Sequence, residues 1–212
     1  MAAEPAVIWR LLPLTGVTLL IAIAGVWRPW LQHRRYGTWG IVLFRSGSWG
    51  QFVRDCLVVV LFALLLWQAI AATGWAPTVA ARPGGPELLT ALGRPFGATL
   101  LFAGLVLLVA AQLNLGASWR IGIDQSATPG LVTGGLYRFC RNPIYLALLM
   151  FIAGYALLLP TRLSVFSLVG ACIGICLQTR AEETHLEQAY GAAYRDYARR
   201  VGRFVTGIGR LR

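Results

Sequence analysis

The chain has 212 residues, of which 57% are hydrophobic and only 13% are charged. A soluble domain carries about a quarter charged residues, so this composition excludes a disordered chain, a coiled coil and an ordinary soluble enzyme. The formal net charge is +11, and all 19 basic residues are arginine. In so apolar a chain, this charge favours contact with a membrane surface over nucleic-acid binding.

Apolar runs predict an all-α polytopic membrane protein with about five transmembrane helices. In chain order the runs are Val7–Val26, Leu57–Ala76, Phe96–Ala117, Ile144–Leu159 and Leu163–Gln178. A spanning helix needs about 20 residues. The first three runs meet this length, and the last two predict a short helical hairpin. Helices are expected because lipid offers the backbone no hydrogen-bond partners.

The arginines predict the topology. With five spans, fifteen of them fall on one side of the membrane and four on the other. Positive residues favour the cytoplasm. We therefore expect an integral protein of a bacterial inner membrane, with its N-terminus outside and its C-terminus cytoplasmic. The alternative is a cleaved signal peptide, which Arg10 and the apolar stretch up to Ala24 resemble. Cleavage would leave an even number of spans and export the Arg-rich segment 28–54.

Two segments are expected to lie outside the spans. Arg28–Arg54 mixes arginine with tryptophan, tyrosine and phenylalanine, a composition typical of anchoring at the headgroup level. Residues 77–95 contain four prolines and two adjacent glycines, which predict an irregular external connection.

Several common site patterns are missing. No G-x-G-x-x-G follows a strand pattern, and a chain without lysine has no Walker loop. Glu182 and His185 have the spacing of a metal-binding pair, but no second copy of the pattern exists, so no metal site is expected. The interiors of the apolar runs contain no Asp or Glu, which disfavours an ion-coupled transporter.

Polar residues gather in two segments that flank the predicted hairpin, Gly116–Tyr145 and Arg180–Phe204. Closure of the hairpin should bring the segments together at the inner membrane boundary. In the second segment, apolar and aromatic residues recur at helical spacing, which predicts a C-terminal amphipathic helix. The residues expected to meet are Arg120, Asp124, Tyr137, Arg141, Asn142 and Tyr145 from the first segment, and Glu182, Glu183 and His185 from the second.

This boundary suits a ligand that carries both charges. Pro143 disfavours helical angles at Asn142 and is well placed in the first turn of a helix, so the bend should present Arg141. A fixed arginine binds a carboxylate through two parallel hydrogen bonds. Glu182 and Glu183 favour a cationic group, and a solvated helix start is the alternative for them. An amino acid moiety has both a carboxylate and a cation.

Four motifs lie in a fixed order around the hairpin. They are Leu131-Val132-Thr133-Gly134-Gly135-Leu136-Tyr137, Arg141-Asn142-Pro143-x-Tyr145, Glu182-Glu183-x-x-Leu186 and Tyr190-Gly191-x-x-Tyr194-x-x-Tyr197-x-x-x-Val201. In this order they resemble the membrane methyltransferases grouped around isoprenylcysteine carboxyl methyltransferase and the phospholipid N-methyltransferases. The resemblance covers about half of the chain, from Gly116 to Phe204.

The resemblance implies S-adenosylmethionine as methyl donor at the cytoplasmic membrane face, and a lipid or lipidated small molecule as acceptor. It implies one domain, with N-terminal spans in residues 1–95 and the cofactor-binding core in residues 96–212. The cofactor-binding residues would be Tyr137, Arg141, Pro143, Tyr145, Glu182, Glu183 and Tyr190, and the catalytic residues Arg141, Asn142 and His185.

Direct methyl transfer is the hypothesis, and it gives the residues individual roles. Arg141 would bind the carboxylate of the cofactor or an acidic acceptor, and the glutamates would hold its amino or ribose groups. Tyr145 and Tyr190 would pack the adenine, and His185 would act as base for an amine acceptor.

Two residues depart from the family pattern. Asn142 stands where the carboxyl methyltransferases have histidine, which is closer to the phospholipid enzymes and leaves the acceptor open. Gly202 stands where the family usually has proline. The alternative functions are an NADPH-dependent membrane reductase of the sterol-reductase type, a transporter and a non-enzymatic scaffold.

Overall fold

The computed structural model describes residues 4–45, 48–74, 87–122 and 130–210. The described residues form helices and no extended strand, which confirms the all-α prediction. The elements are α1 (Glu4–Ile21), a π-helical segment (Ala22–Trp27), α2 (Arg28–Tyr36), α3 (Trp49–Ala72), α4 (Glu87–Leu115), α5 (Pro143–Leu158), α6 (Arg162–Tyr190) and α7 (Ala192–Arg200), with short 3-10 turns at Gly116–Ser118 and Gly135–Arg138.

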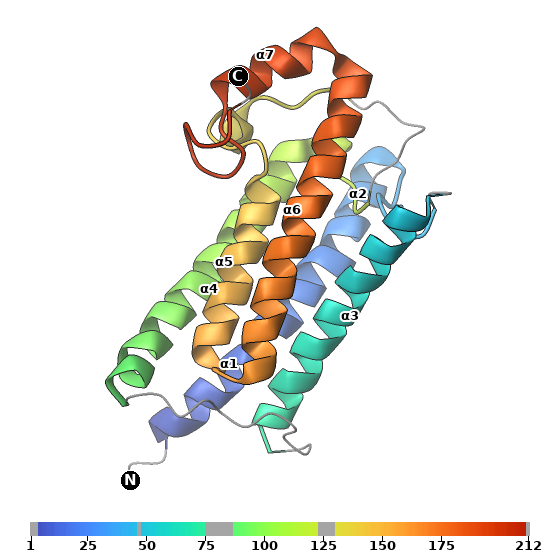
Figure 1. Ribbon diagram of the computed structural model, residues 1–212. Helices are drawn as coiled ribbons and strands as arrows, with labels where there is room; N and C mark the ends of the chain where they lie inside the picture. Colours follow the sequence, from blue (N-terminus) through green and yellow to red (C-terminus); the bar gives the residue numbers. More distant parts are fainter. Residues whose placement is uncertain (1–3, 46–47, 75–86, 123–129, 211–212) are drawn as a thin grey trace.

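The long helices run side by side as a bundle, and α7 lies across the end of the bundle that carries the C-terminus (Figure 1). The N-terminus lies at the opposite end. Val17, Leu65, Leu101 and Phe151 come from four different helices and are fully or almost fully buried in one core. Tyr155 is also buried there, and its hydroxyl donates a 2.7 Å hydrogen bond to the Leu65 carbonyl, which joins α5 to α3.

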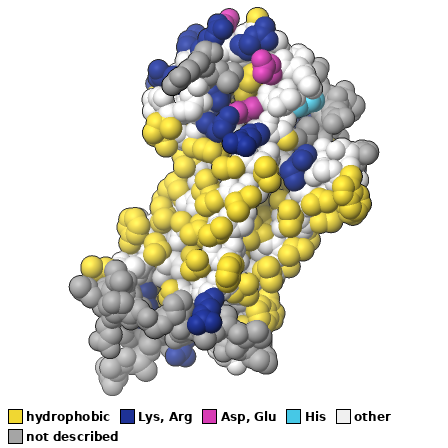
Figure 2. Space-filling view, in the orientation of Figure 1, with side chains coloured by type: hydrophobic (Ala, Val, Ile, Leu, Met, Phe, Trp, Pro, Cys, Tyr) yellow, Lys and Arg dark blue, Asp and Glu magenta, His cyan; other side chains and the backbone are white. Residues whose placement is uncertain are grey.

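On the face shown in Figure 2, hydrophobic side chains cover the middle of the bundle, and arginines gather above them at the C-terminal end. Among the described residues, four helices are long and apolar enough to cross a membrane, by length and composition: Ile8–Tyr36, Trp49–Ala72, Leu92–Ser118 and Arg162–Tyr190. These helices identify an integral membrane protein. The predicted count of five spans is not confirmed, because α5 has only 16 residues.

The helices extend further than the apolar runs predicted. The first helix continues past Val26 to Tyr36, and α6 continues past Gln178 to Tyr190. Helix α4 begins at Glu87 and contains Pro95, so the prediction of an irregular connection was wrong for residues 87–95. Membrane helices tolerate an internal proline, because neighbouring groups satisfy the freed carbonyl. Residues 75–86 lie outside the described residues.

Arg28, which begins the segment predicted to anchor at the headgroup level, is buried within the protein. Its side chain is 1% exposed and packs over the Trp119 ring at 4.5 Å. It donates hydrogen bonds to the carbonyls of Gln112 and Gly116, at 3.3 and 2.8 Å from Nη2. The last carbonyls of a helix lack intrahelical donors and attract a cation. Arg28 therefore caps the C-terminal end of α4.

The C-terminal segment is not one helix. Gly191 adopts a positive φ of 53° and separates α6 from α7. Tyr194, Tyr197 and Ala198 on one face of α7 are buried against the protein, with Leu186 packed beside them. An amphipathic helix at the membrane surface is therefore not confirmed.

Helices α4 and α5 approach each other closely at glycine. A Cβ atom on Gly154 would lie 2.5 Å from the Gly97 carbonyl oxygen and 2.5 Å from the Leu101 nitrogen. One on Gly104 would lie 2.8 Å from the Ala147 carbonyl oxygen. Small residues let membrane helices pack backbone against backbone. The obstructing atoms belong to the backbone, so the side chains around them offer no room for adjustment.

We expect Gly154→Ala to lower the free energy of unfolding by about 1–3 kcal/mol, the usual cost of overpacking. Gly170→Ala on α6 is the matched control, because a Cβ there meets nothing within 4 Å. Alanine is the better helix former by about 1 kcal/mol, so the control should hold or gain stability. Thermal unfolding in detergent measures both, and equal melting temperatures would contradict the close approach.

Candidate active site

A cavity of about 310 Å³ lies at the C-terminal end of the bundle. Side chains from five of the long helices, from α7 and from the 3-10 turn before α5 line it. Its apolar wall includes Leu20, Ala24, Val58, Phe62, Leu108 and Leu148, and its polar residues include Arg54, Asp55, Gln112, Arg120, Gln178, Glu182 and His185. One cavity therefore offers both an apolar and a charged surface.

The structure brings the two predicted polar segments together. Tyr137, Arg141, Asn142, Tyr145, Glu182, His185 and Tyr190 all line the cavity. Pro143 and Glu183 do not belong to its lining. Asp124, which was also expected here, lies outside the described residues.

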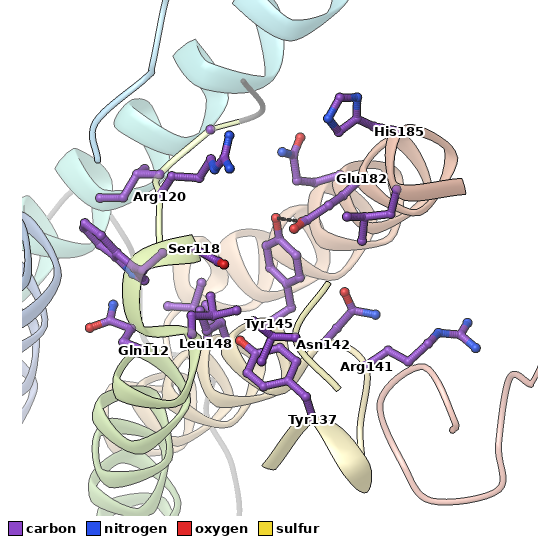
Figure 3. A pocket seen from close by; sticks show the side chains of 18 of the residues that line it. Gln112, Ser118, Arg120, Tyr137, Arg141, Asn142, Tyr145, Leu148, Glu182 and His185 are labelled. Atoms are coloured by element: carbon purple, nitrogen blue, oxygen red, sulfur yellow. Dashed lines mark hydrogen bonds between the residues drawn. The ribbon is translucent and has the colours of Figure 1, made fainter. Parts of the chain in front are cut away.

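Glu182 and Tyr145 form the polar centre of the cavity (Figure 3). The Tyr145 hydroxyl donates a 2.8 Å hydrogen bond to the Glu182 carboxylate, which joins α5 to α6. As the sequence predicts, α5 begins at Pro143, and the preceding Asn142 is not helical, with φ −128° and ψ 56°. This start places Tyr145 in the first turn of α5, facing Glu182.

Arg141 points away from Glu182 in Figure 3 and is fully engaged by the protein. A guanidinium has five N–H groups. Two of them reach Glu183, from Nε at 3.3 Å and from Nη2 at 2.9 Å. The other three donate to backbone carbonyls, those of Ala198 at 2.7 Å, Val201 at 2.9 Å and Gly209 at 3.1 Å. Arg141 has no donor left for a ligand.

Glu183 is held by two arginines. In addition to Arg141, Arg203 approaches it with Nη2 at 2.6 Å from Oε2 and Nε at 3.1 Å from Oε1. Hydrogen bonding to this carboxylate raises the pKa of Arg203 above its usual value. Of the two adjacent glutamates, only Glu182 lines the cavity.

Two tyrosines of α7 have different hydrogen bonding. Tyr194 and Tyr197 are both buried, with their rings edge to face at 6.3 Å. The Tyr197 hydroxyl donates a 2.6 Å bond to the Tyr137 carbonyl, whereas the Tyr194 hydroxyl has no partner among the described residues. Burial raises the pKa of both phenols, so both are neutral at physiological pH.

Sequence reasoning missed the contribution of the N-terminal half to this cavity. Arg54 and Asp55 of α3 line it, and Arg54 Nε donates a 2.8 Å hydrogen bond to Gln178 Oε1 of α6. One signal in the sequence was the polar Gln178, which lies one helical turn before Glu182 on the same face of α6 and so offers a partner to another helix. The second signal was the adjacent charged pair Arg54 and Asp55, which stands just before the apolar run that begins at Leu57.

We expect Tyr197→Phe to lower the free energy of unfolding by about 1–3 kcal/mol, because it leaves the buried Tyr137 carbonyl without its donor. Tyr194→Phe removes the same atom from the same helix but breaks no hydrogen bond. It should leave the stability unchanged or slightly higher. Denaturant or thermal unfolding of the two variants measures the difference, and equal losses would show that the hydroxyls have equivalent partners.

Two comparisons with known proteins find that the chain is similar in sequence to methyltransferases. The phospholipid methyltransferase family matches residues 93–193. A relative from Bradyrhizobium diazoefficiens, methanethiol S-methyltransferase 1, is 28% identical over 206 residues, covering 88% of this chain and 65% of the relative.

The fold has a counterpart among solved structures. The eukaryotic intramembrane Ras methyltransferase ICMT (isoprenylcysteine carboxyl methyltransferase) matches with a TM-score of 0.54 and 18% identity, over 91% of this chain and 61% of that one. The chain thus spans slightly less than two thirds of each of these two proteins. The matched segment holds Tyr137, Arg141, Tyr145 and Glu182. As its motifs predict, the chain is similar in sequence to the phospholipid methyltransferases over residues 93–193, and its fold resembles that of isoprenylcysteine carboxyl methyltransferase.

Proposed function

We propose that the protein transfers the methyl group of S-adenosylmethionine to an acceptor with an apolar body, within the cavity around Glu182 and Tyr145. The observation that carries this proposal is the composition of the cavity. A half-buried carboxylate with aromatic neighbours lies beside an apolar wall, inside a segment that matches the phospholipid methyltransferases. The polar part suits a charged nucleoside, and the apolar part suits a lipid or lipidated acceptor.

The residues of the polar part fit the methyl donor. The Glu182 carboxylate can hold an ammonium or ribose hydroxyl groups, and the Tyr145 hydroxyl fixes its orientation. Tyr145 and Tyr190 offer aromatic rings against which an adenine can pack. The bound sulfonium supplies an activated methyl group, whose bond to sulfur breaks toward sulfur as a lone pair of the acceptor forms the new bond.

The chain then has to align the two reactants and keep water out. Holding reactants in line supplies about 7–11 kcal/mol of barrier lowering. Leu20, Val58, Phe62 and Leu148 form a dry wall for the acceptor. Where the acceptor carries a proton, as an amine or thiol does, the His185 imidazole at the cavity is the candidate to accept it. A carboxylate acceptor needs no base.

The membrane orientation is part of this proposal. The cavity lies at the Arg-rich end of the bundle (Figure 2), and positive residues favour the cytoplasmic side. We therefore place the C-terminus and the site at the cytoplasmic face, in a bacterial inner membrane. A cytoplasmic site gives S-adenosylmethionine access from water.

The melting temperature of the detergent-solubilised protein tests the cofactor. Adenosylhomocysteine should raise it, since a ligand at about 100 times its dissociation constant adds about 2.7 kcal/mol to the free energy of unfolding. A rise with NADPH alone would favour the reductase, and no rise with either ligand would favour a scaffold or transporter.

We expect Glu182→Gln to weaken adenosylhomocysteine binding by about tenfold or more, because a hydrogen bond to a charged group contributes about 1.5–3 kcal/mol. Glutamine keeps the shape of the side chain and a partner for Tyr145. Glu187→Gln is the matched control on the same helix, because Glu187 is exposed and paired only with the exposed Arg195 among the described residues. Calorimetry measures both affinities, and an unchanged affinity in Glu182→Gln would remove Glu182 from the cofactor site.

A further inference from the structure

The full engagement of Arg141 raises a question about the carboxylate of the methyl donor. The sequence assigned this carboxylate to Arg141, but all five N–H groups of Arg141 bond to Glu183 and to backbone carbonyls. Arg203 is bound to Glu183 and does not line the cavity. A carboxylate in a largely apolar cavity needs a cationic partner. Another basic residue of the cavity has to supply it.

We propose that Arg54 of α3 binds the carboxylate of the amino acid end of the methyl donor. This inference rests on the proposed function and extends its site into the N-terminal half of the chain, beyond the family-matched residues 93–193. The sequence had placed the cofactor-binding core entirely in residues 96–212.

Arg54 is half-buried, lines the cavity and is fixed at one point. Its Nε donates to Gln178 Oε1 at 2.8 Å, while Nη1 and Nη2 make no hydrogen bond among the described residues. No ion pair joins Arg54 to the neighbouring Asp55 among the described residues, and the Asp55 carboxylate accepts the Phe44 backbone N–H at 2.8 Å. Adjacent residues on a helix also point in different directions. Arg54 therefore offers a cation with two free donor nitrogens.

The spacing between the Arg54 and Glu182 side chains suits the two charged groups of an α-amino acid. Gln178 and Glu182 are four residues apart on α6, so their Cβ atoms lie about 5–6 Å apart on one face. The contact between Arg54 and Gln178 therefore places the guanidinium about one helical turn from the Glu182 carboxylate. An α-amino acid carries its ammonium and its carboxylate on one carbon. Glu182 would hold the ammonium and Arg54 the carboxylate.

A lipid phosphate is the other anion that an arginine in a membrane protein could bind. It fits this position less well, because Glu182 and Asp55 line the same cavity and would repel a group that has only negative charge. A zwitterion complements both signs. Arg120 also lines the cavity, but its charge interacts with the Glu182 carboxylate. Arg54 has the neutral Gln178 as its side-chain partner among the described residues.

Two ligands that differ only at the amino acid end test this assignment. Adenosylhomocysteine carries that end, and 5′-methylthioadenosine lacks it. We expect Arg54→Met to weaken binding of adenosylhomocysteine about tenfold to hundredfold and to leave binding of methylthioadenosine unchanged. Arg54→Lys should retain part of the affinity, because it keeps the charge without the fork of donors. Calorimetry in phosphate-free buffer with detergent measures the affinity of the wild type and of both variants for each ligand.

Arg35→Met is the matched control, because Arg35 is an exposed cation at the same end of the bundle and does not line the cavity. It should bind both ligands as the wild type does. The melting temperature of each ligand-free variant shows that it is folded. If Arg54→Met does not fold, Arg54→Gln and Arg54→Lys carry the comparison.

Three results would overturn the assignment to Arg54: unchanged affinity for adenosylhomocysteine in Arg54→Met, an equal loss for both ligands, or weakening only of binding to anionic phospholipid vesicles. If the wild type binds neither nucleoside, the proposed function itself fails. If the wild type binds adenosylhomocysteine and Arg54→Met binds it equally well, only the role of Arg54 fails.

Discussion

The architecture of the site depends on one buried ion cluster, the Glu183 carboxylate between Arg141 and Arg203. The side chains of Arg141 and Glu183 are 2% and 12% exposed. Through its other donors, Arg141 reaches the end of α7 and the segment after it. One cluster therefore holds the start of α5, the C-terminal part of α6 and the C-terminal tail together. Removing Glu183 would leave the buried Arg141 charge without its carboxylate partner, and breaking a buried pair in this way typically costs about 3–5 kcal/mol.

The cluster also explains why two adjacent glutamates have different roles. Neighbouring residues of a helix point about 100° apart. When Glu183 faces the arginines, Glu182 faces the cavity and meets Tyr145.

The C-terminal tail after α7 is closely packed at Gly202. A Cβ atom on Gly202 would collide with the backbone carbonyl oxygens of Val205 and Ile208. The glycine that departs from the family pattern is thus required by the path of the tail in this chain.

The sequence predicted well those features that depend on hydropathy and local order. The apolar runs correspond to helices, and the hairpin brings the Arg141 segment beside Glu182 and Glu183, as expected. It did not predict the features that depend on partners distant in the chain. The contact of Arg28 with the end of α4, 88 residues further along the chain, is one such feature. The start of α4 at Glu87 and the break between α6 and α7 at Gly191 likewise depend on packing, which the hydropathy of the sequence does not reveal.

The residues around the cavity show why the N-terminal half matters to the site. Helices α4 and α5 are fixed to each other by backbone contact at Gly97, Gly104 and Gly154 and offer little room for change. The opposite wall, from Leu20 and Ala24 to Val58 and Phe62, belongs to the first helix and α3. Arg54 of α3 extends that wall to α6, where it donates a hydrogen bond to Gln178. The same two helices would therefore shape the space for the acceptor and hold one end of the donor, so that their position relative to α6 controls how the two reactants align.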